Sequence, residues 1–374
     1  MADKIALFAG TNKGGFILTS DGGRAKWDIA GPFLRGYSIF HMTFDPRDGS
    51  IYMAANHEIY GPEVARSADF GGTWTTSDAE PRFEPDSGRN MKRLWHVQPG
   101  RLSEPGVIYA GAEPASLWKS EDSGKTWVEN QQLQEHPSQP KWVPGAGGLC
   151  LHTIILDPSN DDRMSVGVSA AGYFRTDDGG QSWHRKHEGL PRGANEPSPE
   201  EAKIFESYGI EYDPAEDNCI HKVTVDAADP ARQYMQHHGG VFRTQNYGES
   251  WEDIGDGLPE TFGFPIVSHP GKPGTIWVIP NQSGEFRASS SGAFRVFKSE
   301  DAGDSWRAVT DGLPQEAAYL TTLRESMAVD GAEPLGVYVG TKAGTLFGST
   351  DEGESWHTVL SALPPILSLE AAVV

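Results

Sequence analysis

The sequence predicts an all-β protein, a seven-bladed β-propeller. Three observations predict it: a tryptophan motif that recurs seven times, short apolar segments bounded by turn residues, and a terminal apolar segment that can close a ring. The 44 glycines and 26 prolines interrupt the apolar segments regularly, as in proteins built from many short strands. A propeller blade takes about 40 to 50 residues. We therefore expect one domain over residues 1–374.

The recurring motif combines a hydroxyl residue, an aspartate, a glycine and a tryptophan. Its tryptophans are 47 to 68 residues apart, a spacing that fits one four-stranded blade per repeat. The hydroxyl and carboxylate groups can bind nearby backbone amides, glycine permits a positive φ, and tryptophan can pack between sheets. We expect each copy to form the turn between the third and fourth strands of a blade. The copies are TSDGGRAKW (19–27), SADFGGTW (67–74), SEDSGKTW (120–127), TDDGGQSW (176–183), TQNYGESW (244–251), SEDAGDSW (299–306) and STDEGESW (349–356).

An inner strand is expected before each of copies two to seven. The first copy has no such strand, because IALFAGTN (5–12) fits a second strand. The terminal segment PPILSLEAAVV (364–374) can supply the missing strand and close the ring, which leaves no exposed sheet edge. The six inner segments are YSIFHMTFDP (37–46), RLWHVQPG (93–100), GLCLHTIILDP (148–158), NCIHKVTVD (218–226), FGFPIVSHP (262–270) and YLTTLRESMAVD (319–330).

The repeated motif resembles the Asp-box, or BNR-type, repeat of sialidases, sortilin-type receptors and photosystem assembly factors. Five copies match fully, one has Asn246 in place of aspartate, and the first has an extra residue before Trp27. The resemblance implies the propeller fold over nearly the whole chain. It implies little about activity, because in those families the box lies away from the active face. The Arg-Ile-Pro motif typical of sialidases is absent, so we do not expect a sialidase.

Four consecutive inner segments contain a histidine, and when the segments are superposed the histidines fall at one position: His41, His96, His152 and His221. Because inner strands surround the axis, we expect the four imidazoles to converge at the channel mouth. Neutral imidazoles with a nearby carboxylate suit a divalent transition metal, with Zn²⁺ or Mn²⁺ as the expected ion. The alternative is that each histidine bonds to the backbone and only fills the channel.

The ends of the second strands reach the same rim and carry further candidates. We expect Glu113, His57 or His238 to act as general base, with His237 as an alternative to His238, and Lys342 to remove a proton in a lyase. An arginine can bind an anionic group and stabilise developing charge. Arg35 is the leading choice, and other cationic or aromatic candidates are Tyr37, Arg93, Trp95, Trp142 and Arg324. Cys150 and Cys219 precede two of the histidines by two residues, and we expect both to be small buried hydrophobes rather than primary ligands.

The predicted function is that of a metal-dependent hydrolase acting on an ester, phosphoester, lactone or glycosidic bond. The runner-up is a metal-dependent lyase acting on a carboxylate-bearing, uronate-like substrate, by analogy of architecture. A non-catalytic scaffold or assembly factor is the third candidate. Two long connections, 129–148 and 184–218, are expected to lie over the active face, the second with a short helix near Pro199.

The composition limits the classes of binding partner and the cellular compartment that we expect. The net charge of −21 disfavours nucleic acid and anionic lipid, so a small-molecule substrate, neutral or anionic, is expected instead. No run of about 20 apolar residues suits a transmembrane helix. The N-terminus lacks the pattern of a signal peptide, and only two cysteines occur, so we expect a cytoplasmic protein, either a monomer or a small homo-oligomer.

Overall fold

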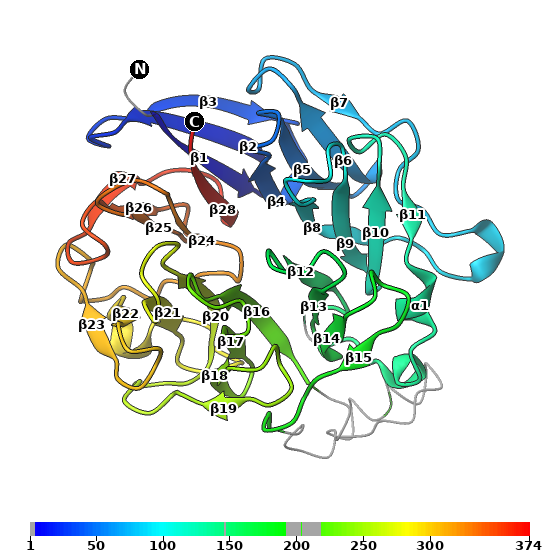
Figure 1. The fold of residues 1–374 in the computed structure, drawn as a ribbon. Helices are drawn as coiled ribbons and strands as arrows, with labels where there is room; N and C mark the ends of the chain where they lie inside the picture. Colours follow the sequence, from blue (N-terminus) through cyan, green and yellow to red (C-terminus); the bar gives the residue numbers. More distant parts are fainter. Residues whose placement is uncertain (1–3, 146, 192–202, 204–217) are drawn as a thin grey trace.

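Seven four-stranded antiparallel sheets surround a common axis in the computed structural model (Figure 1). The structure describes residues 4–145, 147–191, 203 and 218–374. The innermost strands are β28, β4, β8, β12, β16, β20 and β24, and they face one another across the centre. The predicted seven-bladed propeller is therefore confirmed.

The blades follow one another along the chain, each from its inner to its outer strand except where the ring closes. The first comprises β28 (Ile366–Val373), β1 (Lys4–Thr11), β2 (Gly14–Asp21) and β3 (Asp28–Phe33); the second β4 (Ser38–Phe44), β5 (Ile51–His57), β6 (Gly61–Ser67) and β7 (Thr75–Thr76); the third β8 (Arg93–Pro99), β9 (Ile108–Glu113), β10 (Ser116–Ser120) and β11 (Val128–Glu129); and the fourth β12 (Leu151–Leu156), β13 (Met164–Val168), β14 (Gly172–Thr176) and β15 (His184–Arg185).

The remaining three blades repeat this order. The fifth comprises β16 (Ile220–Val225), β17 (Gln233–His237), β18 (Gly240–Thr244) and β19 (Glu252–Asp253); the sixth β20 (Gly263–Ser268), β21 (Ile276–Pro280), β22 (Val296–Ser299) and β23 (Arg307–Val309); and the seventh β24 (Met327–Val329), β25 (Val337–Gly340), β26 (Leu346–Ser349) and β27 (His357–Leu360). Short helices occupy connections: α1 (Gln131–Gln134), η1 (Pro85–Ser87), η2 (Gln139–Lys141) and η3 (Ser290–Gly292).

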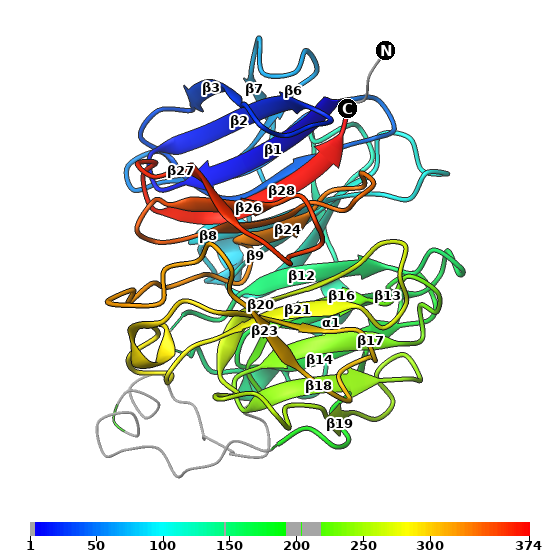
Figure 2. The same ribbon diagram turned by 90° about the vertical axis from the view of Figure 1, so that its left-hand side faces the viewer.

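The first blade is completed as predicted, by a strand from the other end of the chain. β28 pairs antiparallel with β1, from Ile5 opposite Val373 to Thr11 opposite Ile366. Figure 2 shows the two strands side by side beneath β2. The ring is thereby closed without an open edge on β1.

Each tryptophan motif forms the turn between the third and fourth strands, as predicted. In the third blade, the amide of Gly124 donates to Ser120 Oγ at 2.9 Å and the amide of Thr126 donates to Asp122 Oδ1 at 2.9 Å. Gly124 has φ +86°, a conformation that favours glycine. Trp127 Nε1 donates to Ser77 Oγ of the second blade at 3.2 Å, so the motif also links neighbouring blades.

The hydrophobic core lies between adjacent blades rather than at the axis. Between the sixth and seventh blades, for example, Trp277, Phe294, Val337 and Phe347 pack into one buried cluster. Apolar side chains on both faces of each sheet make this packing possible. The axis itself is left to polar side chains, and these form the sites described next. No helix in the described ranges is long and apolar enough to span a membrane.

The predicted helix near Pro199 and most of the connection 184–218 lie outside the described residues. The other long connection, 129–148, contains α1 and η2 in its described part. The side chain of Asn130 caps α1 by accepting a hydrogen bond from the Leu133 amide at 2.9 Å.

Candidate metal centre

The four histidines of the inner strands do not occupy equivalent positions, which corrects the superposition made from sequence. Each of the four inner strands that carry these histidines contains a β-bulge, where one extra residue faces no partner. In β4 and β8 the extra residues are Phe40 and Trp95, and a histidine follows each. In β12 and β16 the extra residue is the histidine itself, His152 or His221.

Because of this offset of one residue, His41 and His96 correspond to Thr153 and Lys222 of the next two blades rather than to His152 and His221. The predicted ring of four imidazoles is therefore divided. His41 and His96 meet in the channel, whereas His152 and His221 each bond to a backbone carbonyl of the next blade.

The first group, which we call the channel cluster, consists of His41, His96, Lys222 and Glu325. The rings of His41 and His96 are in contact, with centroids 4.0 Å apart and planes tilted by 36°. Glu325 Oε2 lies 3.9 Å from His41 Nε2, and Glu325 Oε1 lies 3.9 Å from His96 Nδ1. Lys222 Nζ forms an ion pair with Glu325 Oε2. All four come from different blades, so the cluster ties the ring together across its centre.

The two histidines of the channel cluster are uncharged, and His96 Nδ1 and Glu325 Oε1 are buried without a hydrogen-bond partner. Burial lowers the pKa of His41 to about 4, against the opposing effect of Glu325, and burial lowers the pKa of His96 well below its usual value. Both imidazoles are neutral at pH 7. The amide of Val97 donates to His41 Nδ1 at 3.4 Å, so the proton of His41 resides on Nε2, which faces Glu325. His41, His96 and Glu325 each also offer one potential ligand atom within 4.8 Å of those of the other two, so the channel cluster contains a group that could hold a metal ion.

His152 is held by the protein through both ring nitrogens. Its Nε2 lies 2.9 Å from the carbonyl oxygen of Ile220, and its Nδ1 lies 3.0 Å from Thr153 Oγ1. The side chain is completely buried. This is the backbone-bonded arrangement that the sequence left open as the alternative to metal binding.

The second group, which we call the mouth cluster, consists of Cys219, His221 and His238. One potential ligand atom from each residue lies within 4.8 Å of those of the other two. His221 is buried, Cys219 is partly exposed and His238 is exposed. Ligand atoms around tetrahedral zinc are roughly 3.5 Å apart, given bond lengths of about 2.0 to 2.3 Å. A small side-chain adjustment therefore brings the three atoms to coordination distance, with the open position toward solvent.

His221 is oriented in the way a metal-bound histidine requires. Its Nδ1 lies 2.5 Å from the carbonyl oxygen of Gly263. A carbonyl only accepts, so Nδ1 carries the proton and Nε2 keeps its lone pair. Burial lowers the pKa of His221, against the opposing effect of Cys219. The ring also stacks on Phe264, with centroids 4.7 Å apart, and this contact restricts its rotation.

Cys219 has the acidity of a good metal ligand. Burial raises the pKa of its thiol, but His221, Ser169 and Arg324 together outweigh burial and lower it to about 7. Ser169 Oγ lies 3.6 Å from Cys219 Sγ. Cys150 differs: it is fully buried, and burial raises the pKa of its thiol to about 11. The expectation of a small buried hydrophobe suits Cys150, whereas Cys219 offers a thiolate near neutral pH.

The predicted rim residues are dispersed. Glu113 is buried, and its Oε2 lies 3.2 Å from both Arg93 Nη1 and Trp95 Nε1. The loop before β12 presses against it: a Cβ on Gly148, which has φ +95°, would lie 2.6 Å from Glu113 Oε1. Glu113 is therefore a partner of Arg93 in this structure, and the candidate base nearest the mouth cluster is His238, a member of it.

Three other predicted residues lie apart from both clusters. His57 accepts hydrogen bonds at Nδ1 from the amides of Ile59 and Tyr60, at 3.1 and 3.2 Å, and stacks on the Tyr60 ring. Arg35 and Lys342 are exposed. His237, the alternative to His238, is buried and accepts a hydrogen bond from the Gly239 amide at 2.9 Å.

Three members of these clusters were not among the predicted site residues. Cys219 was expected to be a hydrophobe, although the spacing Cys-x-His placed it near His221. The signals for the other two were a lysine, Lys222, directly after His221, and an acidic residue, Glu325, directly after Arg324 in the last inner segment.

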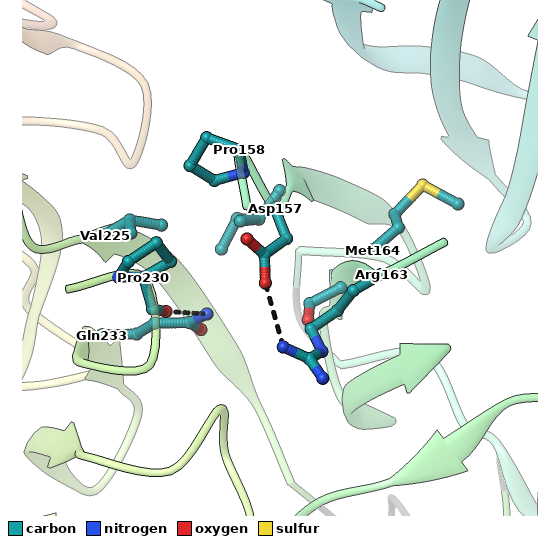
Figure 3. Close-up of a pocket in the computed structure, with 9 residues that line it drawn as sticks. Asp157, Pro158, Arg163, Met164, Val225, Pro230 and Gln233 are labelled. Carbon is teal, nitrogen blue, oxygen red and sulfur yellow. Dashed lines mark hydrogen bonds and ion pairs between the residues drawn. The ribbon is translucent and has the colours of Figure 1, made fainter. Parts of the chain in front are cut away.

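A small pocket elsewhere is separate from these clusters. It lies between the fourth and fifth blades and is lined by residues that include Asp157, Arg163, Val225 and Gln233 (Figure 3). Arg163 Nη1 lies 3.2 Å from Asp157 Oδ2. These residues follow the ends of β12 and β16 that are opposite to His152 and His221. The ion pair and the turns around it stabilise the far rim of the ring.

No protein-family model matches the chain. Among curated proteins, it is 25% identical over 284 residues to the oligoxyloglucan-reducing end-specific xyloglucanase of Emericella nidulans, covering 71% of this chain and 32% of that protein. It is 28% identical over 147 residues to a probable enzyme of the same name from Neosartorya fischeri, covering 38% and 17%. The chain spans about a third or less of the length of these relatives.

Solved structures share the fold. The GH74 xyloglucanase of Xanthomonas campestris superposes with a TM-score of 0.61 at 16% identity, over 98% of this chain and 52% of that chain. YCF48 bound to D1 peptide gives 0.53 at 14% identity, over 86% and 82%. Apo AztD from Citrobacter koseri gives 0.56 at 10% identity, over 99% and 98%. This chain is a β-propeller similar in fold to these proteins and a distant relative of the two xyloglucanases.

Proposed function

We propose that this protein is a metal-dependent hydrolase whose metal centre is the mouth cluster. The observation that carries the proposal is the hydrogen bond from His221 Nδ1 to the Gly263 carbonyl, which leaves Nε2 directed at Cys219 and His238. Three protein ligands with one side open to solvent are the pattern of catalytic rather than structural zinc sites. The thiolate ligand favours Zn²⁺ over Mn²⁺, because soft sulfur binds zinc well and manganese poorly.

When bound there, zinc supplies a Lewis acid and lowers the pKa of a coordinated water to about 7. The protein supplies the rest. Gly263 and Phe264 fix the orientation of His221, and the partial exposure of Cys219 admits a substrate to the open side. The distant xyloglucanase relatives, whose names describe glycoside hydrolysis, support hydrolysis as the reaction class. A glycosidic bond is accordingly the first bond to test.

Metal content tests the centre directly. Purified protein is expected to hold about one zinc ion per chain, and the variants Cys219→Ala and His221→Ala are expected to lose it. His357→Ala is the matched control, because His357 is exposed on an outer strand. Equal zinc content in all four proteins, or no stoichiometric metal in any, would contradict the centre.

Activity then separates the reaction classes. Wild type is expected to cleave one of a panel of aryl glycosides, aryl esters, phosphoesters, lactones and uronides with addition of water, and to lose that activity in Cys219→Ala. An unsaturated uronide product would indicate the lyase instead. A protein that holds zinc but cleaves none of these, and binds a peptide, would instead favour a non-catalytic scaffold.

A further inference from the structure

Arg324 stands at the mouth of the channel, beside the mouth cluster. It directly precedes Glu325 in the chain. Glu325 belongs to the channel cluster, and Arg324 lies toward the rim. Its guanidinium lies over the Trp95 ring, with the central carbon 5.1 Å from the ring centroid. The side chain is half-buried. Arg324 therefore has a fixed position close to the proposed site of chemistry.

This guanidinium lacks a counter-charge. Within the described part of the chain, no carboxylate lies within 4.0 Å of Arg324, and its one hydrogen-bond acceptor is Cys150 Sγ, at 3.4 Å. Cys150 is a neutral thiol, since burial raises its pKa to about 11, and a thiol is a weak acceptor. The nearby carboxylate of Glu113 is paired with Arg93 instead, at 3.2 Å.

Several other arginines are neutralised by a carboxylate. The chain has 52 acidic and 31 basic residues, and among the described residues Arg287 and Arg295 are also half-buried without an ion pair, whereas the more deeply buried arginines below are paired. Arg47 lies 2.6 Å from Asp45, and Arg24 lies 3.1 Å from Asp330. A partly desolvated charge without a partner costs free energy, which an anionic ligand can offset.

The loop before β12 lies against Arg324: a Cβ built on Gly147 would be 3.6 Å from Arg324 Nη2, an ordinary van der Waals distance. On the other side, the positive charge of Arg324 acts on Cys219 and on His221, and it is among the causes that lower the pKa of each. Arg324 and the mouth cluster thus share one electrostatic environment.

We propose that Arg324 binds an oxyanion group of the substrate, a carboxylate or a phosphate ester, and so places the neighbouring bond at the mouth cluster. The placement of the reacting bond at the mouth cluster rests on the proposed function, whereas the binding of the oxyanion group by Arg324 does not. The planar guanidinium can donate two parallel hydrogen bonds to such a group. The substrate class is therefore an anionic one, such as an acidic sugar.

Calorimetric titration with three matched sugars tests the proposal. Glucuronate presents a carboxylate, glucose 6-phosphate a phosphate, and glucose neither. We expect one or both anionic sugars to bind wild type, glucose to bind at least about 10-fold more weakly, and Arg324→Gln to lose about 10-fold or more in affinity for the anionic sugars. Preference for one of the two identifies the oxyanion.

Two further variants make the result decisive. Arg35→Gln removes an exposed cation of the same face and is expected to bind as wild type does. Arg324→Lys keeps the charge without the planar fork and is expected to bind at intermediate strength, which also covers the case in which Arg324→Gln does not fold. Equal affinity of folded Arg324→Gln or Arg324→Lys and wild type, or equal affinity for glucose and the anionic sugars, would overturn the proposal.

The same titration on Cys219→Ala separates this inference from the proposed function. Anion binding that persists in a variant without zinc would support the Arg324 site whatever the metal analysis shows. Zinc bound normally by a protein that discriminates against none of the three sugars would leave the metal centre intact and remove the anion site.

Discussion

The Nδ1 atom of His221 and the carbonyl oxygen of Gly263 are 2.5 Å apart, and they belong to neighbouring blades. The bond therefore joins the inner strand β16 to the first residue of β20. It fixes both the tautomer and the direction of the imidazole. A site on an inner strand gains its precision here from the contact between two blades rather than from a loop.

Zinc is expected to stabilise the fold. At a free concentration of 100 times its dissociation constant, it adds about 2.7 kcal/mol to the free energy of unfolding, which raises the Tm of a chain of this size by roughly 3 °C. Differential scanning calorimetry with zinc and with a chelator measures the difference. Cys219→Ala should show no such difference, and a Tm shift of the same size in that variant would place the ion elsewhere.

The two thiols are expected to differ in reactivity. Cys219, with a pKa of about 7 and partial exposure, should be alkylated by iodoacetamide at a rate that rises through pH 7 and levels off above it. Cys150 is buried and has a pKa of about 11, so the folded protein should protect it. Peptide mapping after timed alkylation distinguishes the two sites. Preferential labelling of Cys150 would contradict the described environments, and added zinc should slow the labelling of Cys219.

The ion pair in the channel is expected to behave as a buried pair. Lys222→Met leaves the Glu325 carboxylate without its cation and should lower the free energy of unfolding by about 3 kcal/mol. Lys222→Met combined with Glu325→Gln should recover most of that loss, because the unpaired charge is gone. Urea unfolding of the single and double variants gives the coupling energy. Strictly additive losses would show that the two groups do not interact.

Stability should decline in acid because of the buried imidazoles. The pKa of His41 is about 4 in the folded protein, as a result of burial, against an ordinary value of 6.5. Between these values the unfolded chain binds more protons, so stability rises with pH across this window and is lost as pH falls through it. One such histidine contributes a slope of at most about 1.4 kcal/mol per pH unit. His41→Gln should flatten the dependence of the urea midpoint on pH, whereas the exposed His184→Gln should not.

The fold was predictable because its signal is repeated and local. Seven tryptophans at blade spacing give the number of blades, and the missing strand before Trp27 requires a strand from elsewhere in the chain. Each inference uses only turn chemistry and the rule that sheet edges are paired. Neither depends on the exact register of any strand.

The positions of the site residues depend on the register of the inner strands, and the prediction of these positions was incomplete. A bulge adds one residue to β4, β8, β12 and β16, before the histidine in the first two strands and at the histidine in the last two. The sequence contained a warning: His41 lies four residues before Asp45, whereas His221 lies five residues before Asp226. Alignment on the aspartates would have separated the two groups. That Glu325 reaches His41 and His96 from another blade follows from ring closure, which spacing along the chain does not encode.

The pairing of β28 with β1 has a consequence for synthesis on the ribosome. Until residues 366–373 have been made, β1 has one edge without a partner, and an unpaired apolar edge is a template for aggregation. The blade that contains β1, although the first of the seven to be translated, is completed after all the others. Assembly of this ring therefore ends at the blade whose synthesis began first.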